Sequence, residues 1–354
     1  MGQSINKNSF SAHDFDAFST RLHQNLTALR HTLKKPDFGK VANTLGAELE
    51  FYIVDGQGYP LAKNRQIQEQ SNDPNVTLEL NRYNLEYNFP VYDFCQKPFL
   101  NLESDIQSAM KKLDALASDQ GGNILAIGIL PTLTEDFLGP SFMTQDTRYQ
   151  VLSEILIAMR GGSFDLDIQG KDHLETTRQD ITAEGICTSF QVHFCSDIKN
   201  FVDTWNAMAL VTPLVLAMSA NSPLLFGKRL WQESRGPLFK QATDSRREGM
   251  RWHDLARVDL TRDWVRRTPY ELFAQRVYLY PPLIPLCKGE DPLVEVSEGR
   301  LPTLQELNLH NGTIWHWNRP IYSNEGNGHI RIELRSLPAG PTAIDMAANA
   351  AFHI

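Results

Sequence analysis

The stretch GAELEFYIVD, residues 46–55, decides the fold class, because its apolar and polar residues alternate with the period of a β-strand. Leu49 and Phe51 fall on one face, which the pattern assigns to a core, and Glu48 and Glu50 fall on the other. Two adjacent carboxylates repel each other, so this face requires either solvent or a bound cation. Solvent is the ordinary explanation for a single pair of this kind.

Helix and strand patterns surround this stretch in irregular order. Without a regular strand–helix repeat, an α+β fold with a mainly antiparallel sheet is favoured over a parallel one. Further strands are expected at 76–89, 124–130, 188–195, 312–317 and 328–337, and helices at 11–33, 100–117, 146–159, 199–219, 263–278 and 341–353.

The composition is that of an ordinary folded protein of 354 residues, with 42% hydrophobic and 21% charged residues. We predict a single domain over 1–354, in which residues 1–40 form an N-terminal helix and a linker. The net charge of -8 without a dense basic block argues against nucleic-acid binding. Four cysteines without CxxC spacing predict reduced thiols in the core or the sheet and a cytoplasmic location.

Two segments bear on export and membranes. The first ten residues, MGQSINKNSF, lack the basic start and apolar stretch of a signal peptide, so export by that route is not expected. The most apolar run, Leu210–Met218, contains Pro213 and is far shorter than the roughly 20 residues that span a bilayer. We predict a buried helix there and no membrane association.

Two later strand patterns also carry polar faces. His193 lies on the polar face of the strand at 188–195, and Arg331, Glu333 and Arg335 share one face of the strand at 328–337. A lone strand histidine is usually a satisfied core residue, and a strand arginine is as readily an ion-pair partner across the sheet. These residues indicate a site only if their strands bring them together.

Glu79 and Glu86 complete the set of unexplained acidic residues. A single regular strand would point them to opposite faces because their separation is odd, so a bend, a bulge or a helical turn must intervene if both serve one site. If they converge with the other groups, five carboxylates and one imidazole would line one face of the sheet. That arrangement is too repulsive to hold without cations.

Carboxylates with one imidazole suit Mg²⁺ or Mn²⁺, and Mg²⁺ in ATP sites is held by carboxylates together with substrate phosphates. Arg335, on the same face as Glu333, has the fork of donors that holds a transferred phosphoryl group bidentately. The pattern therefore predicts metal-dependent ATP chemistry.

Several segments resemble the glutamate-cysteine ligase superfamily, most closely its second family of carboxylate-amine ligases. They are GAELEFYIVD, TLELNRYNLEYNFP, FQVHF, SANSPLLFGKRLWQESR, GTIWHWNRP and HIRIELRSLPAGPT, in order from about residue 43 to residue 350. The resemblance implies a fold like the catalytic domain of glutamine synthetase. Such a fold is a curved, mainly antiparallel sheet flanked by helices, with metals, ATP and glutamate on the concave face.

The resemblance also implies roles for individual residues. The implied metal ligands are Glu48, Glu50, Glu79, Glu86, His193 and Glu333. Arg335, with Glu333 beside it, is implied to contact the transferred phosphate. Asn221, Arg235, Arg148 and Arg319 are implied to lie near nucleotide or substrate, although Asn221 could simply end a helix and Arg148 and Arg319 could be ordinary surface residues.

The implied reaction has two steps: ATP phosphorylates the side-chain carboxylate of glutamate, and an amine then displaces phosphate to give an amide. The acceptor stays open between cysteine and another amine or amino acid, because the Gln-Val-His segment departs from the paired histidines of many family members. Two other functions also stay open: phosphoryl transfer to a guanidino or carboxylate group, and non-catalytic sensing of glutamate or nucleotide. The general base and the oligomeric state are not assigned.

Overall fold

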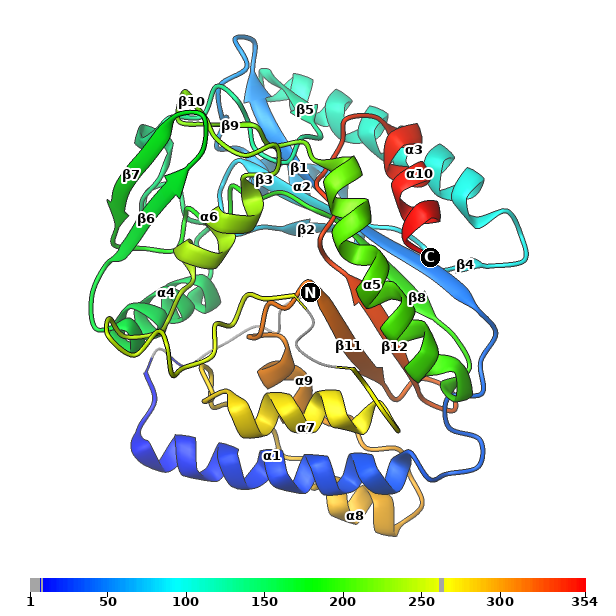
Figure 1. Ribbon diagram of the computed structural model, residues 1–354. Coiled ribbons are helices and arrows are strands. Elements are labelled where there is room, and N and C mark those ends of the chain that lie inside the picture. Colours follow the sequence, from blue (N-terminus) through cyan, green and yellow to red (C-terminus); the bar gives the residue numbers. More distant parts are fainter. Residues whose placement is uncertain (1–6, 8, 261–263) are drawn as a thin grey trace.

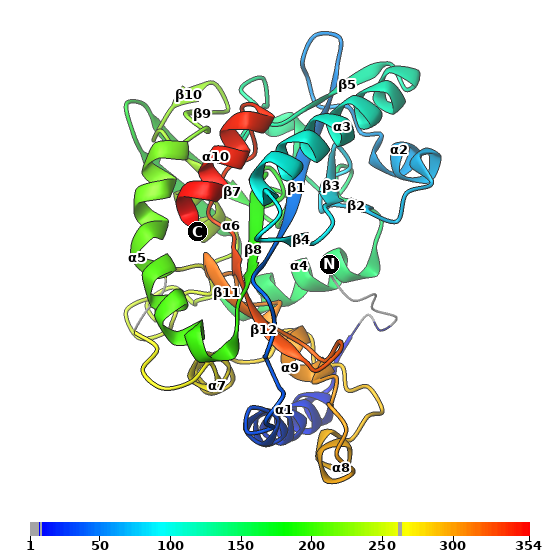
Figure 2. The same cartoon turned by 90° about the vertical axis from the view of Figure 1, so that its right-hand side faces the viewer.

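The computed structural model describes the chain except for residues 1–6, 8 and 261–263. Its main sheet has eight strands in the order β11-β12-β8-β1-β3-β2, with β4 and β5 also paired to β1. All of these pairings are antiparallel, and the sheet is strongly curled (Figures 1 and 2). The predicted α+β class with a curved antiparallel sheet is therefore confirmed.

The strands of the main sheet are β1 (Thr44–Asp55), β2 (Val76–Leu78), β3 (Asn84–Asn88), β4 (Tyr92–Asp93), β5 (Gly122–Leu125), β8 (Phe190–Cys195), β11 (Asn318–Ser323) and β12 (His329–Leu334). Two separate hairpins are formed by β6 (Phe164–Gln169) with β7 (His173–Arg178) and by β9 (Leu224–Leu225) with β10 (Lys228–Arg229).

Two groups of packed helices can be seen in Figure 1. Near one face of the sheet, α10 packs against α3 and α5, whereas α1 packs against α7, α8 and α9 at the other end of the molecule. The bounds are α1 (Ala12–Thr32), α2 (Asn64–Ser71), α3 (Pro98–Asp119), α4 (Thr147–Arg160), α5 (Phe201–Ser219), α6 (Arg235–Ala242), α7 (Tyr270–Leu279), α8 (Pro292–Ser297), α9 (Gln305–Asn311) and α10 (Ala343–His353).

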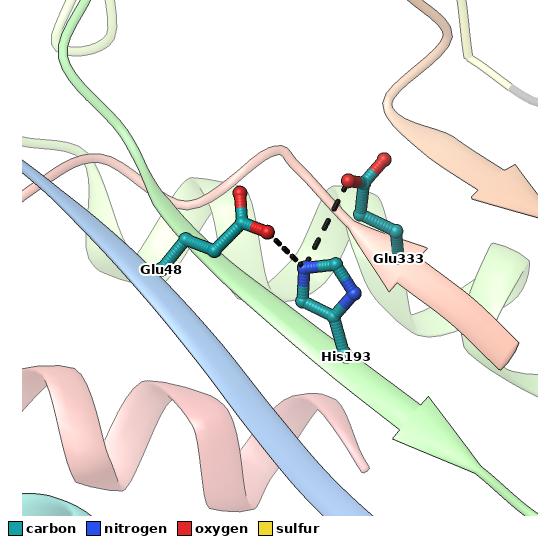
Figure 3. A group of neighbouring side chains, drawn as sticks. All are labelled: Glu48, His193 and Glu333. Atoms are coloured by element: carbon teal, nitrogen blue, oxygen red, sulfur yellow. Dashed lines mark ion pairs between the residues drawn. The ribbon is translucent and has the colours of Figure 1, made fainter. Parts of the chain in front are cut away.

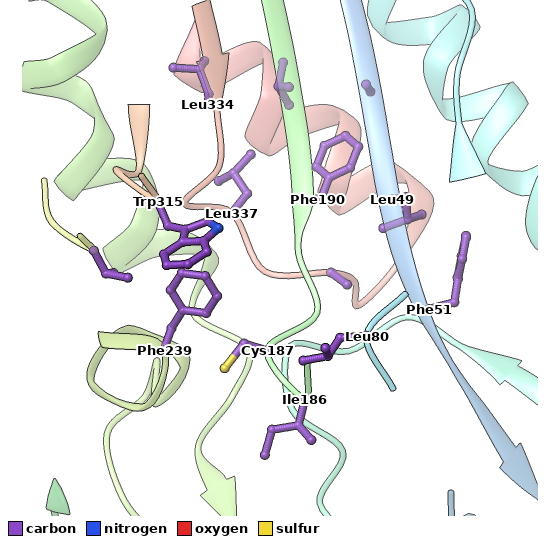
Figure 4. Packing of buried hydrophobic residues seen from close by; sticks show 14 of the residues in the cluster. Leu49, Phe51, Leu80, Ile186, Cys187, Phe190, Phe239, Trp315, Leu334 and Leu337 are labelled. Atoms are coloured by element: carbon purple, nitrogen blue, oxygen red, sulfur yellow. The ribbon is translucent and has the colours of Figure 1, made fainter. Parts of the chain in front are cut away.

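The central strands divide their faces as the alternation predicts. Leu49, Phe190 and Leu334, from β1, β8 and β12, are fully buried in the core beneath the sheet (Figure 4). The pairing register places Glu48 opposite Gln191 and Glu333 opposite His193. Because partners in an antiparallel pair share a face, the polar faces of the three strands form one surface.

The prediction for residues 312–317 is wrong: this segment is a loop, and the strand β11 begins at Asn318. Proline normally argues against a strand, and Pro320 lies within this one. It is tolerated because, among the described strands, β11 is an edge of the sheet with β12 as its one partner. The strand expected at 124–130 is also shorter, since β5 ends at Leu125.

Helix α7 starts at Tyr270, so the predicted helix at 263–278 begins too early, and its first residue lies outside the described residues. Most of the segment used to predict the absence of a signal peptide lies outside them as well. All four cysteines are free, but only Cys187 and Cys195 are buried, whereas Cys95 and Cys287 are exposed. The single domain and the cytoplasmic location stay predictions.

Helix α5 is buried on one side only, which corrects the prediction of a buried helix. Trp205, Met208 and Val215 lie in the core, whereas Leu210 and Met218 are 62% and 71% exposed. By length and composition, Ile198–Ser219 is apolar enough to cross a membrane, although core helices of soluble proteins pass the same test. The absence of membrane association stays a prediction.

Helix α1 begins with a capping box, and this makes a specific stability prediction. Ser11 Oγ accepts a hydrogen bond from Asp14 N at 3.3 Å, and Asp14 Oδ2 accepts one from Ser11 N at 2.7 Å. We expect Ser11→Ala to lower the free energy of unfolding by about 1 kcal/mol, because an orphan N–H loses its partner. Urea denaturation measures this. Ser104→Ala, at an exposed interior position of α3, is the control and should change stability by much less.

Candidate active site

A cavity of about 500 Å³ lies on the polar face of the sheet. Its walls come from β1, the β2–β3 hairpin, α4, β11 and the segment after β12. The sequence-predicted residues that line it are Glu48, Glu50, Glu79, Glu86, Arg148, Arg319 and Arg335. Residues far apart in the sequence thus meet at one site.

The first group of candidate metal ligands is Glu48, His193 and Glu333, from three neighbouring strands (Figure 3). His193 Nε2 lies 3.1 Å from Glu48 Oε1 and 3.8 Å from Glu333 Oε1. Burial favours the neutral acid at Glu48, but the electrostatic attraction of His193 outweighs it and lowers the pKa to about 2. The group therefore presents ionised carboxylates to an imidazole.

Arg331 orients the ring of His193. Its Nε donates a hydrogen bond of 3.1 Å to His193 Nδ1, so Nδ1 acts as an acceptor and a neutral ring carries its proton on Nε2. Within the described part of the chain, Nε2 is buried and forms no hydrogen bond, although Glu48 Oε1 lies 3.1 Å away as an ion-pair partner. Such an orphaned nitrogen fits a metal ligand, provided that Arg331 releases Nδ1 so that the proton can move there.

The second group is Glu50, Glu79 and Glu86. Glu79 directly follows β2, and β3 returns antiparallel with Thr77 opposite Glu86. The chain reverses at residues 79–83, so the turn between two strands, rather than a bulge within one, brings the two glutamates to the same face. The convergence that the odd spacing left in doubt is confirmed.

Among the residues that the structure describes, no arginine, lysine or histidine forms an ion pair with this second group, although the positive charges of Arg335 and Arg235 act on Glu50. Burial and the neighbouring carboxylates raise the pKa of Glu79 well above its ordinary value and that of Glu86 to about 7. Burial also raises the pKa of Glu50, although hydrogen bonds from Ser189 N and Oγ, at 2.7 and 2.9 Å, oppose the shift. A divalent cation would relieve this repulsion.

In each group, one ligand atom per residue can be chosen so that all three lie within 4.8 Å of one another. Carboxylate oxygens with one imidazole are the donors that Mg²⁺ and Mn²⁺ accept. The donor chemistry and the orphaned His193 nitrogen thus fit two divalent cations.

Three arginines border the groups. Arg319 donates from Nε and Nη2 to the two oxygens of Glu333. Arg335 donates from Nη1 to Gln191 Oε1 at 2.7 Å and lies 3.5 Å from Glu333 Oε2. Arg148, near the start of α4, has a buried Nη1 without a partner among the described residues. The cavity therefore combines clustered acids with arginine donors.

The sequence that forms this cavity matches a protein-family model. The family model of glutamate-cysteine ligase family 2 (GCS2) matches residues 44–353, from the first residue of β1 to the last residue of α10. The chain belongs to this family. GCS2 membership supports an ATP-dependent ligase, whereas the particular substrates are a matter for experiment. No curated protein sequence matches the chain significantly.

Two solved structures resemble the GCS2 chain weakly. A glutamate-cysteine ligase from Francisella tularensis, in complex with AMP, has 15% identity and a TM-score of 0.28 over 52% of this chain and 34% of that one. A bifunctional glutathione synthetase from Pasteurella multocida has 13% identity and a TM-score of 0.32, over 59% and 26%. The chain thus spans about a third or less of both proteins.

Two predicted residues of this GCS2 protein support the walls of the cavity. The Arg235 guanidinium is buried and donates to Glu233 Oε1, Thr188 O and Ser336 O. Asn221 donates from its backbone N to Glu233 and from Nδ2 to Ala339 O. These hydrogen bonds join separate loops, so both residues stabilise the loops around the cavity. Their contact with nucleotide stays a prediction.

Sequence reasoning missed Glu184, which lies in the turn between β7 and β8 and lines the cavity. Burial and the negative charge of Glu50 raise its pKa to about 8. Alternation and spacing do not identify a residue in a turn. The one sequence signal at this position is Gly185, because a glycine in a turn is typical of a backbone that packs closely against a neighbouring segment.

Proposed function

We propose that the protein is an ATP-dependent carboxylate-amine ligase that uses Mg²⁺ or Mn²⁺, with glutamate as the carboxylate donor. The observation that carries the proposal is the pair of ligand groups on the polar face of the sheet, from which Glu48, Glu50, Glu79 and Glu86 line the cavity together with Arg148, Arg319 and Arg335. Membership of GCS2 supports the ligase class. Glutamate comes from the family resemblance and not from the shape of the cavity.

The residues of the two groups, Glu48, His193 and Glu333 in one and Glu50, Glu79 and Glu86 in the other, would hold the cations. When bound, these cations neutralise negative charge on phosphate oxygens. Arg335 would hold the transferred phosphoryl group, because its guanidinium lies at the boundary between the groups and charge-assisted donors of this kind bind phosphate bidentately. Arg148, with an unpartnered buried nitrogen, would bind a second anionic group of a substrate.

The bonds balance without a protein nucleophile. The terminal phosphoryl group of ATP passes to a carboxylate oxygen of glutamate and releases ADP. The uncharged amine nitrogen then bonds to the acyl carbon, the carbon–oxygen bond to phosphate breaks, and the released phosphate takes up the proton that the nitrogen loses. The task of the protein is to position these groups and to exclude water.

The proposal is tested by incubating the protein with ATP, Mg²⁺ and glutamate and then adding amines and amino acids in turn. We expect ADP release that depends on both glutamate and an amine, with an amide product of matching mass. ADP release that persists without any amine would contradict ligation and would favour phosphoryl transfer alone.

Metal affinity should depend on pH through the second group. Glu86 has a pKa of about 7, so its proton must leave when a cation binds. We expect the dissociation constant for Mn²⁺ to rise by at least about tenfold between about pH 8 and about pH 6, because Glu86 alone releases one proton and the raised pKa of Glu79 adds to the effect. Calorimetric titration at the two pH values measures this. An affinity that does not change over this range would count against Glu86 as a ligand.

A further inference from the structure

Glu184 is a carboxylate that the chemistry proposed so far does not use. It lines the main cavity and also a side chamber of about 40 Å³, which shares Glu50, Glu79 and Arg335 with that cavity. It belongs to neither ligand group. Within the part of the chain that the structure describes, no residue forms a hydrogen bond or an ion pair with its carboxylate.

The backbone around Glu184 is held in place. Its N–H donates to Ile181 O at 2.9 Å, and its carbonyl accepts from Cys187 N at 2.9 Å. A Cβ on Gly185 would meet Asn81 Nδ2 at 2.8 Å, so the turn approaches the β2–β3 hairpin as closely as glycine allows. The turn therefore fixes the carboxylate next to the hairpin that carries Glu79.

Aromatic rings form another wall of the side chamber. Trp317 and Phe239 both line it, with ring centroids 5.8 Å apart and planes inclined by 40°. Cys187 lies beside Phe239 (Figure 4) and also lines the chamber. A carboxylate near aromatic faces is a favourable setting for an ammonium group, which gains a charge-assisted hydrogen bond and a cation–π contact.

The other charges at the chamber are already matched. Glu50 and Glu79 belong to the second ligand group, where a divalent cation would compensate them. Arg235 is bonded to Glu233 and to two backbone carbonyls, and Arg335 donates to Gln191 beside Glu333. Among the described residues Glu184 thus has no hydrogen-bonded or ion-paired cation, although the charge of Arg335 acts on it from a distance, and a buried carboxylate without such a partner is costly.

We propose that Glu184 binds the ammonium group of the second substrate, which therefore enters as a protonated primary amine and releases one proton to solvent before its nitrogen attacks. Its nitrogen lies in the side chamber between Glu184 and Trp317. The chamber has room for only a few water-sized groups, so the remainder of the acceptor extends into the main cavity. This inference rests on the proposed ligase function and adds the residue that recognises the acceptor.

Two nucleophiles of similar size and different charge test the inference. Near neutral pH hydroxylamine is mostly uncharged, whereas methylamine is a cation. Hydroxamate formation from ATP, glutamate and hydroxylamine is measured with increasing methylammonium chloride at constant ionic strength. We expect methylammonium to compete in the wild type and its inhibition constant to rise about 10- to 100-fold in Glu184→Gln, relative to the KM for hydroxylamine.

Matched variants separate charge from structure. Glu184→Asp keeps the charge, so methylammonium should still compete with hydroxylamine better in this variant than in Glu184→Gln. Methylammonium should inhibit Glu175→Gln, a change on the exposed face of β7, as strongly as it inhibits the wild type. A general loss of activity in Glu184→Gln with unchanged selectivity would overturn the inference. So would failure of methylammonium to compete in the wild type.

A second measurement separates this inference from the proposed function. Methylammonium should raise the melting temperature of the wild type more than an equal concentration of sodium does, and this difference should vanish in Glu184→Gln. If no variant forms hydroxamate, the ligase proposal fails, and the melting temperatures still decide whether Glu184 binds an ammonium group.

Discussion

Glu86→Gln will lower ligase activity by at least about 100-fold and will at the same time stabilise the metal-free protein. Loss of a residue that only hydrogen-bonds to a metal ligand already lowers metal affinity or activity 10- to 100-fold, so loss of a ligand itself should lower activity at least as much. Glu86 is 5% exposed and accepts hydrogen bonds from Thr77 Oγ1 and Asn88 Nδ2 at 2.9 and 3.0 Å. The amide oxygen of glutamine can accept both, so the variant loses charge without losing these bonds.

The expected gain in stability follows from the sign of the pKa shift. The folded protein raises the pKa of Glu86 from 4.5 to about 7, so it binds this proton more tightly than the unfolded chain does. Ionised Glu86 therefore lowers the free energy of unfolding. This destabilisation is absent below the unfolded pKa, grows as the pH rises towards 7 and is constant above pH 7. Glutamine removes a penalty of about 1–3 kcal/mol near pH 8 and none near pH 4.

Urea denaturation at the two pH values, beside the ligase assay, measures both effects. Glu175→Gln is the matched control, since its carboxylate is exposed on β7 and should leave activity and stability nearly unchanged. Glu333 is less suitable for this test, because its carboxylate holds Arg319 through two hydrogen bonds and its loss would strand a buried charge. Lower stability of Glu86→Gln near pH 8 would show that the acidic group is structural.

Arg335→Lys will lower kcat by about 1000-fold, with a smaller effect on the KM for ATP. Lysine keeps the positive charge but not the planar fork, so charge near Glu50 and Glu184 is retained while bidentate contact with the moving phosphoryl group is lost. Arginines in this role contribute about 10³- to 10⁵-fold in other phosphoryl-transfer enzymes. Steady-state kinetics with varied ATP separates kcat from KM.

A surface arginine provides the comparison for Arg335. Arg229 is also bonded through its guanidinium to a carboxylate, that of Asp172, but it lies on the exposed β9–β10 hairpin. Arg229→Lys should therefore keep full activity. An unchanged kcat in Arg335→Lys would remove this residue from the phosphoryl-transfer step.

The central strands could be predicted because their signal is local. Alternation in β1, β8 and β12 fixes which side chains share a face, and it placed Glu48 with Glu50 and Glu333 with Arg335. The order of these strands depends on contacts between distant segments, which alternation does not encode. Convergence of the groups was therefore a hypothesis until the register of β8 with β1 and β12 was known.

Other features escaped prediction for different physical reasons. Pro320 obscured β11, because the tolerance of an edge strand for proline depends on strand order. Arg235 and Asn221 occur in a matching motif, but only the folded chain shows that they bond to neighbouring loops. Glu184 lies in a turn, where no periodicity identifies a side chain that faces a cavity.

The central claim is that ATP activates a carboxylate at this acidic cavity before an amine attacks it. It is tested most directly with glutamate that carries a heavy oxygen isotope in its side-chain carboxylate, together with ATP, Mg²⁺ and hydroxylamine. If an acyl phosphate forms, one labelled oxygen must appear in the phosphate released with each hydroxamate. Release of ADP with unlabelled phosphate would contradict the account.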